Sequence, residues 1–369
     1  MRIESIRFKN YKLLRDATLP LEPLTVIVGP NGSGKSTALE ALGGVAAALR
    51  DSSYAFGGST HAQLDRSRTV GTVLGRDLVE VGVTASTGSG PVQAVWSSGV
   101  PGPPPGSFTT PPKLGEILPA ELAGSPEATA LVDAVRSFHS YALAPDRIRE
   151  PAELTPDAAL SHDGATLAAA LDQVRDRDPE VLAALNAELT RWLPEYDQVL
   201  FDTPAKGRRA VALRTRVGRH RIGAKQLSSG TLLALGLLTI VHGDTGAQIV
   251  GIEEPEAAIH PRLLRNVYDA LVRMAYPAEH GIDRAPRQVI VTTHSPYLLD
   301  LFRDHPESVV IAERHEDAAT FARLADREDF DEIVSGGPLG EAWYTGVLGG
   351  VPTSPGAAAV VPAGVDAEA

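Results

Sequence analysis

The sequence contains no cysteine, and it has no uninterrupted apolar run of eighteen residues or more. Without cysteine, disulfide bonds and thiolate metal sites are excluded, which agrees with a reducing compartment. Without a long apolar run, a membrane-spanning helix is not expected. The N-terminal stretch alternates charged and apolar residues, whereas a signal peptide needs a continuous apolar segment. We therefore expect a cytoplasmic protein that has no membrane contact.

An excess of basic residues is also missing, because the 369 residues carry a formal net charge of −12. Binding to DNA regardless of sequence depends on basic surface that releases counterions, so any DNA contact must be local. Apolar residues make up 43% of the chain, which is enough to bury a sizeable core. The length allows two or three packed units.

A glycine-rich loop follows the apolar run at residues 24–28. Residues 29–36 match G-x-x-x-x-G-K-S, and residues 36–50 have helical composition. In a strand, loop and helix of this kind, backbone N–H groups turn toward bound phosphates and the helix dipole favours the anion. Lys35 is predicted to reach the β- and γ-phosphates, and Ser36 is predicted to ligate Mg²⁺. The predicted nucleotide-binding residues are Gly29, Pro30, Asn31, Gly32, Ser33, Gly34, Lys35, Ser36 and Thr37.

Two acidic residues end a second buried segment, at residues 247–254. Carboxylates at the end of a central strand lie beside a phosphate loop, where one can hold Mg²⁺ and the next can polarise an attacking water. We assign the first role to Glu253 and the second to Glu254. A solvated helix start is the alternative, because helix N-termini favour acidic residues.

Two weaker elements accompany these motifs. Residues 227–230 read L-S-S-G before a long apolar helix, a pattern that an ordinary serine N-cap also explains. His294 ends the buried segment at residues 287–294, where an imidazole can bridge the γ-phosphate and the attacking water. A structural role for a single histidine at a strand end remains open.

The order phosphate loop, L-S-x-G, E-E and His resembles the ATP-binding cassette ATPase superfamily, and within it the RecF, SMC and OLD-like branch. The stretches "EEPEAAIHP", "LSSGTLLALGLL", "HDGATLAAAL" and "LGEAWYTGVLGG" are similar to a group of predicted stand-alone bacterial AAA/ABC-type ATPases. The resemblance covers roughly residues 1–50 and 140–350. It implies an α/β fold: a P-loop ABC-type ATPase head with a mixed or parallel sheet core, an antiparallel β lobe and an inserted helical subdomain.

The resemblance also implies ATP and Mg²⁺ as cofactors and ATP hydrolysis, with Lys35, Glu254 and His294 as the catalytic residues. Heads of this superfamily meet head to tail, so Ser228 and Gly230 would cap the nucleotide of a second copy. This arrangement implies a homodimer.

Other parts of the family pattern are less clear. Residues 257–260 would be the D-loop at the dimer seam. The Q-loop glutamine has no assignable position, and Gln63 is a weak candidate. A role in DNA repair or anti-phage defence follows from the branch, with DNA or a separate effector protein as candidate partners.

The patterns divide the chain into five segments. These are residues 1–50 (N-terminal part of the ATPase core), 51–112 (β-rich lobe and Pro-rich loop), 113–194 (helical insert), 195–350 (C-terminal part of the core) and 351–369 (disordered tail).

An OLD-like nuclease is one alternative, because Glu313 and the pair Asp329 and Asp331 mimic pieces of a Toprim metal site. The two pieces lie too close in sequence for the βα unit that must separate them. An ATPase subunit of a nuclease or effector complex, or of a membrane transporter, are further alternatives; the insert at 51–194 is long for a transporter subunit.

Basic residues gather just before the L-S-x-G element, on a predicted hairpin that is either a solvated strand face or a phosphate-contacting surface. They are Lys206, Arg208, Arg209, Arg214, Arg216, Arg219, Arg221 and Lys225. His242 and His260 lie near acidic residues, but their spacing is not that of metal ligands, so packing roles are expected.

Overall fold

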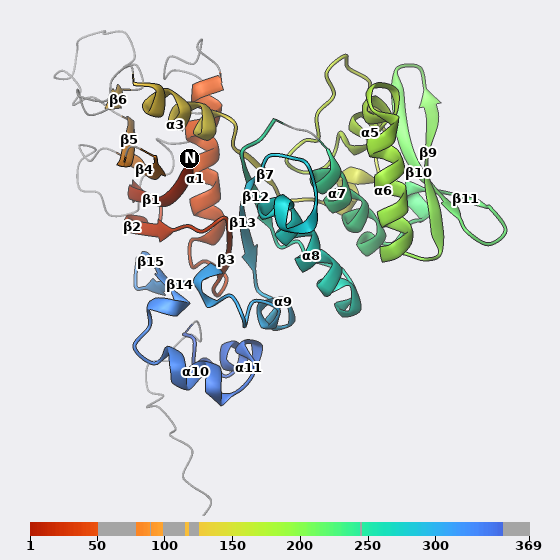
Figure 1. The fold of residues 1–369 in the computed structure, drawn as a ribbon. Coiled ribbons are helices and arrows are strands. Elements are labelled where there is room, and N and C mark those ends of the chain that lie inside the picture. The colour runs from red at the N-terminus through yellow and green to blue at the C-terminus, as the bar shows by residue number, and fades with distance from the viewer. Residues whose placement is uncertain (51–78, 89, 99–114, 118–124, 244–245, 350–369) are drawn as a thin grey trace, which may run out of the picture.

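The computed structural model describes residues 1–50, 79–88, 90–98, 115–117, 125–243 and 246–349, whose strands form three sheets (Figure 1). The predictions for Gln63, for the Pro-rich loop at 99–112 and for the tail at 351–369 lie outside these residues. In the described part of the chain, no helix is long and apolar enough to cross a membrane.

The central sheet runs in the order β15-β14-β3-β13-β12-β7, in which only the outermost pair, β14 and β15, is antiparallel. Its strands are β3 (Leu24–Val28), β7 (His139–Tyr141), β12 (Ile249–Glu253), β13 (Gln288–Thr293), β14 (Val309–His315) and β15 (Ala318–Arg323). Because parallel strands end at the same edge of a sheet, the residues after β3, β12 and β13 lie near one another. This edge carries the predicted phosphate loop, the two acids and His294.

The central sheet is covered on both faces, as is usual for parallel strands. All five residues of β3 are buried. Val26 and Val28 belong to one hydrophobic cluster, and Ile27 between them belongs to the other. Successive side chains of a strand point to opposite faces, so β3 contributes to both cores at once.

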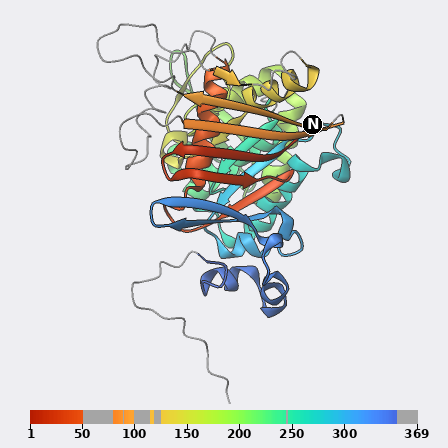
Figure 2. The same ribbon diagram turned by 90° about the vertical axis from the view of Figure 1, so that its left-hand side faces the viewer.

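The second sheet is antiparallel and lies on the N-terminal side of the molecule, where Figure 2 shows its strands side by side. Its order is β2-β1-β4-β5-β6, with β1 (Arg2–Tyr11), β2 (Leu14–Pro20), β4 (Val79–Thr87), β5 (Gly90–Ser98) and β6 (Gly115–Ile117). Strands β4 and β5 pair as an antiparallel hairpin, in the segment predicted to be β-rich. The helices α1 (Lys35–Arg50) and α3 (Pro126–Arg136) pack against each other and share this core.

The third sheet belongs to a separate lobe, shown in green in Figure 1. It contains β8 (Ala152–Glu153), β9 (Tyr196–Ala205), β10 (Arg208–Thr215) and β11 (Arg221–Gly223), and it packs against α5 (Leu167–Arg177) and α6 (Pro179–Trp192). Asp178 accepts a hydrogen bond from the Val181 amide and caps α6. We call this unit the helical lobe.

The helical lobe and the predicted insert at residues 113–194 cover different sets of elements. Helix α3 belongs to the N-terminal core, and β7 is an edge strand of the central sheet. Conversely, β9, β10 and β11 lie beyond residue 194 but pair within the helical lobe. A strand of only three residues is hard to recognise in a sequence, because three positions are too few to establish an alternation of apolar and polar residues.

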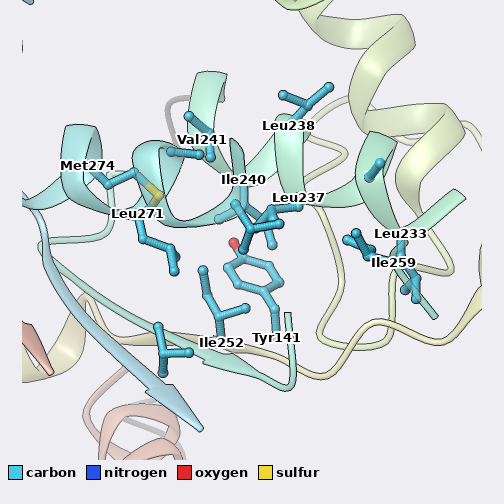
Figure 3. Close-up of a cluster of buried hydrophobic side chains, with 14 of the residues drawn as sticks. Tyr141, Leu233, Leu237, Leu238, Ile240, Val241, Ile252, Ile259, Leu271 and Met274 are labelled. Carbon is cyan, nitrogen blue, oxygen red and sulfur yellow. The ribbon is translucent and has the colours of Figure 1, made fainter. Parts of the chain in front are cut away.

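A buried helix starts directly after the strands of the helical lobe, to which its first residues belong, and joins this lobe to the central sheet. In α7 (Ser229–His242), every residue from Thr231 to Val241 is buried, as expected for a helix that is apolar all round. Figure 3 shows α7 with α8 (Leu264–Ala275) around Tyr141 and Ile252 of the sheet. The remaining helices are α4 (Pro145–Ile148), α9 (Pro296–Asp300), α10 (Phe330–Gly336) and α11 (Leu339–Tyr344).

Candidate active site

The phosphate loop connects β3 to α1, as predicted. Gly32 and Gly34 have φ values of 76° and 96°, a left-handed conformation that favours glycine. At Gly29 the constraint is space, because an added Cβ would lie 2.4 Å from the carbonyl oxygen of Ala312 in β14. The glycines of the motif are therefore required by the backbone path and by the neighbouring strand.

Lys35 is the buried cation of this loop, with 5% of its surface exposed. Its Nζ donates to the carbonyl oxygens of Gly29, at 2.7 Å, and Pro30, at 2.9 Å. Burial lowers the pKa of Lys35 to about 8, although the nearby carboxylates of Glu254 and Glu253 act in the opposite direction. The ammonium group is therefore largely charged at neutral pH and is held at the centre of the loop.

Glu254 and His294 meet across the ends of β12 and β13. The Nε2 atom of His294 lies 3.3 Å from Oε1 of Glu254. Burial and the Lys35 cation both lower the pKa of His294, so the imidazole is predominantly neutral at pH 7. Glu254 has a φ of 45°, an unfavourable conformation for a non-glycine residue that is often found at functional sites.

Ser36 and Glu253, the two predicted metal ligands, line one cavity of about 660 Å³. The rest of its lining comes from Tyr11, α1, residues 138–141 at β7, and residues 160–162. Within the described residues, no group of three or more histidine and acidic side chains is placed to hold a metal ion. A hydroxyl and one carboxylate suit Mg²⁺ that is completed by phosphate oxygens and water, so the residues present fit this ion.

The L-S-x-G element begins α7 in the helical lobe. Ser228 is exposed, and its Oγ accepts a hydrogen bond from the Thr231 amide at 3.1 Å, which is the geometry of an N-cap. An added Cβ on Gly230 would lie 2.5 Å from the carbonyl oxygen of Ala258, so glycine lets the predicted D-loop approach the helix start. Neither Ser228 nor Gly230 lines the cavity that contains Ser36 and Glu253.

Two residues near the site carry contacts that the sequence analysis missed. Arg149 follows α4, and its Nη2 donates at 3.0 Å to the Oγ of Ser229, the variable position of the L-S-x-G element. Glu256 accepts hydrogen bonds from Thr293 and His294. Glu256 is visible in the sequence as the last residue of "EEPE". Its partner Thr293 lies on β13 and is brought to it by tertiary packing.

The basic hairpin is partly ion-paired within the helical lobe. Arg214 Nε lies 2.7 Å from Asp197, and an Nη2 of Arg221 lies 2.5 Å from Asp202. Arg209 contacts the buried Asp172. These acids neutralise part of the predicted basic face and favour the solvated strand interpretation.

His242 has the packing role that was expected, whereas His260 is exposed and caps the short helix at Pro261–Leu263. His242 Nε2 lies 2.7 Å from the buried carboxylate of Glu188, which also binds Arg273. Burial opposes ionisation of Glu188, but the hydrogen bonds from His242 and Arg273 outweigh it and lower the pKa to about 2. The imidazole of His260 accepts a hydrogen bond from the Arg262 amide.

Comparison with known proteins adds the family. A family model described as "AAA domain, putative AbiEii toxin, Type IV TA system" matches residues 109–300, slightly more than half of the chain. The chain belongs to this AAA domain family. A second family, described as "AAA ATPase domain", matches residues 1–53 of this AAA domain protein, the part that holds the phosphate loop. These matches and the fold identify the ATPase head that the sequence motifs predicted.

Individual relatives of the AAA domain protein cover different shares of it. A stretch of 40 residues is 52% identical to the OLD nuclease of Thermus scotoductus (strain ATCC 700910 / SA-01), which corresponds to 11% of this chain and 8% of that nuclease. An SMC head bound to the C-winged helix domain of ScpA matches with a TM-score of 0.53 at 12% identity, over 87% of this chain and 97% of that one.

A second SMC head of similar fold has an extended coiled coil and is bound to the C-terminal domain of ScpA derived from Pyrococcus furiosus. Its TM-score is 0.53 at 12% identity, over 90% of this chain and 99% of that one. At this identity the SMC similarities concern the fold, and they confirm the α/β ATPase head expected from the sequence.

Proposed function

We propose that this protein hydrolyses ATP with Mg²⁺ in two composite sites, each closed by a head-to-tail homodimer. The division of the site within one chain carries the proposal. Lys35, Glu254 and His294 gather at one edge of the central sheet, whereas Ser228 and Gly230 begin a helix in the helical lobe. An exposed helix N-terminus with free N–H groups suits an anion presented by another copy.

The residues at the sheet edge have complementary roles in this proposal. Lys35 and the loop amides hold the phosphates, with Ser36 and Glu253 as the ligands of Mg²⁺, which would neutralise charge that develops on the phosphate oxygens. Glu254 orients the attacking water and accepts its proton. The neutral imidazole of His294 lies beside Glu254 and donates or accepts a hydrogen bond at the same water.

The Glu254→Gln variant tests the central step. It keeps the size of the side chain but removes the proton acceptor, so we expect ATP hydrolysis to fall by about 10²- to 10⁴-fold. With ATP and Mg²⁺ this variant is expected to accumulate as a dimer, measured by light scattering after size-exclusion chromatography. Glu180→Gln, at an exposed site on α6, is the control and should behave as wild type. A Glu254→Gln protein that binds ATP yet stays monomeric would contradict the proposal.

We infer that the ATP cycle acts in DNA repair or anti-phage defence, with DNA or an effector protein as the partner. The similarity to an OLD nuclease and to SMC heads bound to ScpA supports this setting. The dimer measurement is therefore repeated with linear and circular DNA at low salt. Arg216→Glu, which alters an exposed position after β10, should weaken DNA retention if the basic hairpin contacts phosphates.

Nuclease activity is the second candidate, favoured by the local identity to the OLD nuclease. In this chain Glu313 lies on β14 of the ATPase sheet, where its carboxylate pairs with His315. A cleavage assay on plasmid DNA with Mg²⁺ or Mn²⁺ separates the two functions. Cleavage that survives Lys35→Ala and is lost in Glu313→Gln would favour the nuclease.

A further inference from the structure

A third acid follows the two assigned acids. Glu256 lies in the turn after β12, and its Oε1 accepts a hydrogen bond from the Thr293 hydroxyl at 2.5 Å and another from the His294 amide at 3.2 Å. The Thr293 hydroxyl in turn accepts a hydrogen bond from the Ser295 amide at 2.9 Å. One carboxylate oxygen thus organises three consecutive residues at the end of β13.

The same turn is attached to β13 on the other side of Pro255. The Glu254 amide donates to the carbonyl oxygen of Thr292 at 2.9 Å. Contacts before and after Pro255 therefore hold the turn against the strand that carries His294. The left-handed conformation of Glu254 is unfavourable, so its persistence requires such neighbouring restraints.

The environment of Glu256 argues against a role in stability alone. Its Oε2 is buried and has no hydrogen-bond partner among the described residues. Burial raises the pKa of Glu256, which shows how poorly the site solvates a carboxylate. Leaving a buried polar atom unpaired costs about 1–3 kcal/mol, whereas an apolar side chain of similar size avoids that cost.

We propose that Glu256 is a positioning residue that fixes the backbone of His294 and thereby keeps the His294 imidazole against Glu254. The kinetic consequence of this inference rests on the proposed ATP hydrolysis. Its structural consequence rests on the hydrogen bonds of Glu256 alone. Among the described residues, the hydrogen bonds of Glu256 go to Thr293 and His294 and not to the proposed metal ligands, so Glu256 acts through His294.

Steady-state ATP hydrolysis by four full-length variants tests the kinetic consequence. Glu256→Ala should lower kcat about tenfold with an ATP Kd within threefold of wild type, because the phosphate contacts are intact. Glu256→Gln keeps an oxygen that can accept both hydrogen bonds, so it should restore at least half of the wild-type kcat. In a His294→Ala background, Glu256→Ala should cause no further loss, since a residue that acts through His294 has nothing left to position.

The exposed Glu279→Ala is the matched control and should leave kcat unchanged. Equal losses from Glu256→Ala with and without His294 would overturn the inference, as would a Gln variant as slow as the Ala variant. These comparisons distinguish positioning from a general loss of folding, which would also reduce ATP binding.

Hydrogen exchange of the peptide that covers residues 288–299, without nucleotide, tests the structural consequence independently of hydrolysis. The His294 and Ser295 amides should exchange at least tenfold faster in Glu256→Ala and at the wild-type rate in Glu256→Gln. Unchanged exchange in Glu256→Ala would refute the inference. If the exchange result holds but the wild-type protein does not hydrolyse ATP, the proposed function fails while the positioning contact stands.

Discussion

The two halves of the proposed site are built in opposite ways. On the phosphate side, Lys35 is buried and bound by two backbone carbonyl oxygens, and its neighbours come from the ends of three strands of one sheet, β3, β12 and β13. On the other side, Ser228 is exposed and its hydroxyl is used by its own helix. The first half is assembled by folding of one chain, whereas the second presents a helix start outward. We therefore expect that a substitution in one half of the site leaves the other half intact.

Among the changes that separate the two halves, the largest expected effect comes from Ser228→Arg, which places a bulky side chain on the outward half. Hydrolysis should fall about 10²- to 10³-fold, comparable with the loss of a transition-state donor, while ATP binding stays within threefold. Mixing this variant with Lys35→Ala should restore activity, because a head-to-tail pair then contains one site with both halves intact. Activity that mixing does not restore would mean that the halves do not combine across copies.

The next-largest expected effect concerns the buried carboxylate of Glu188, which joins α6 to α7 and α8. Glu188→Ala leaves His242 and Arg273 without their buried carboxylate, and breaking a buried pair costs about 3–5 kcal/mol of unfolding free energy. Urea unfolding measures this loss, with the exposed Glu180→Ala expected to lose less than about 1 kcal/mol. An ATP affinity that falls along with stability would show that the two halves are coupled in folding.

Lowering the pH should remove the same contribution of Glu188 to the free energy of unfolding. The pKa of Glu188 is lowered from its ordinary value to about 2 in the folded protein, so its stabilisation is complete above pH 4.5 and is lost as the pH falls toward 2. Glu188→Gln should flatten this part of the pH profile of unfolding. A variant with the same acid sensitivity as wild type would assign the loss to other carboxylates.

Lys35→Ala is expected to have a smaller effect, on nucleotide affinity. Removing a charge-assisted hydrogen-bond donor costs about 1.5–3 kcal/mol, or roughly ten- to a hundredfold in ATP Kd. The matched control is Lys225→Ala, an exposed lysine before the L-S-x-G element, which should bind ATP as wild type does. Calorimetric titration measures both, and an unchanged Kd in Lys35→Ala would remove the phosphate-side assignment.

The smallest effect is a pH dependence of that affinity. In the protein without nucleotide, Lys35 has a pKa of about 8, and bound phosphates would raise this pKa. Raising the pH above 8 removes the proton that binding needs, so ATP affinity should fall by up to tenfold per pH unit. Lys35→Arg should bind ATP without this dependence, because guanidinium keeps its charge. A wild-type affinity that is constant from pH 7 to 9.5 would contradict a protonated Lys35 as the phosphate ligand.

Local patterns were sufficient for the phosphate-side elements. The run at residues 24–28, the glycine loop and the helix after it are contiguous, so their order in sequence already describes their order in space. Glu253, Glu254 and His294 could be placed with them because each follows a buried segment, and parallel strands end together. The N-caps Ser125 and Asp178 are equally local, since each bonds an amide three residues on.

What sequence patterns missed depends on contacts between distant segments. The short β7 was not recognised because its three residues acquire a strand conformation only by pairing with β12. The ion pair of Arg214 with Asp197 joins two neighbouring strands, β10 and β9. The hydrogen bond between Glu256 and Thr293 joins two segments that α8 separates in the sequence. In each case the partner is chosen by the sheet register, which local composition does not encode.

The alternation of β3 between two cores has a consequence for how this segment tolerates change. Exchanges among Val, Ile and Leu at Val26, Ile27 or Val28 alter volume slightly and should be common in a library selected for folding. Deleting any one of these residues turns every later side chain to the wrong face and moves the start of the glycine loop by about 3.3 Å. Length is thus under stricter selection here than residue identity.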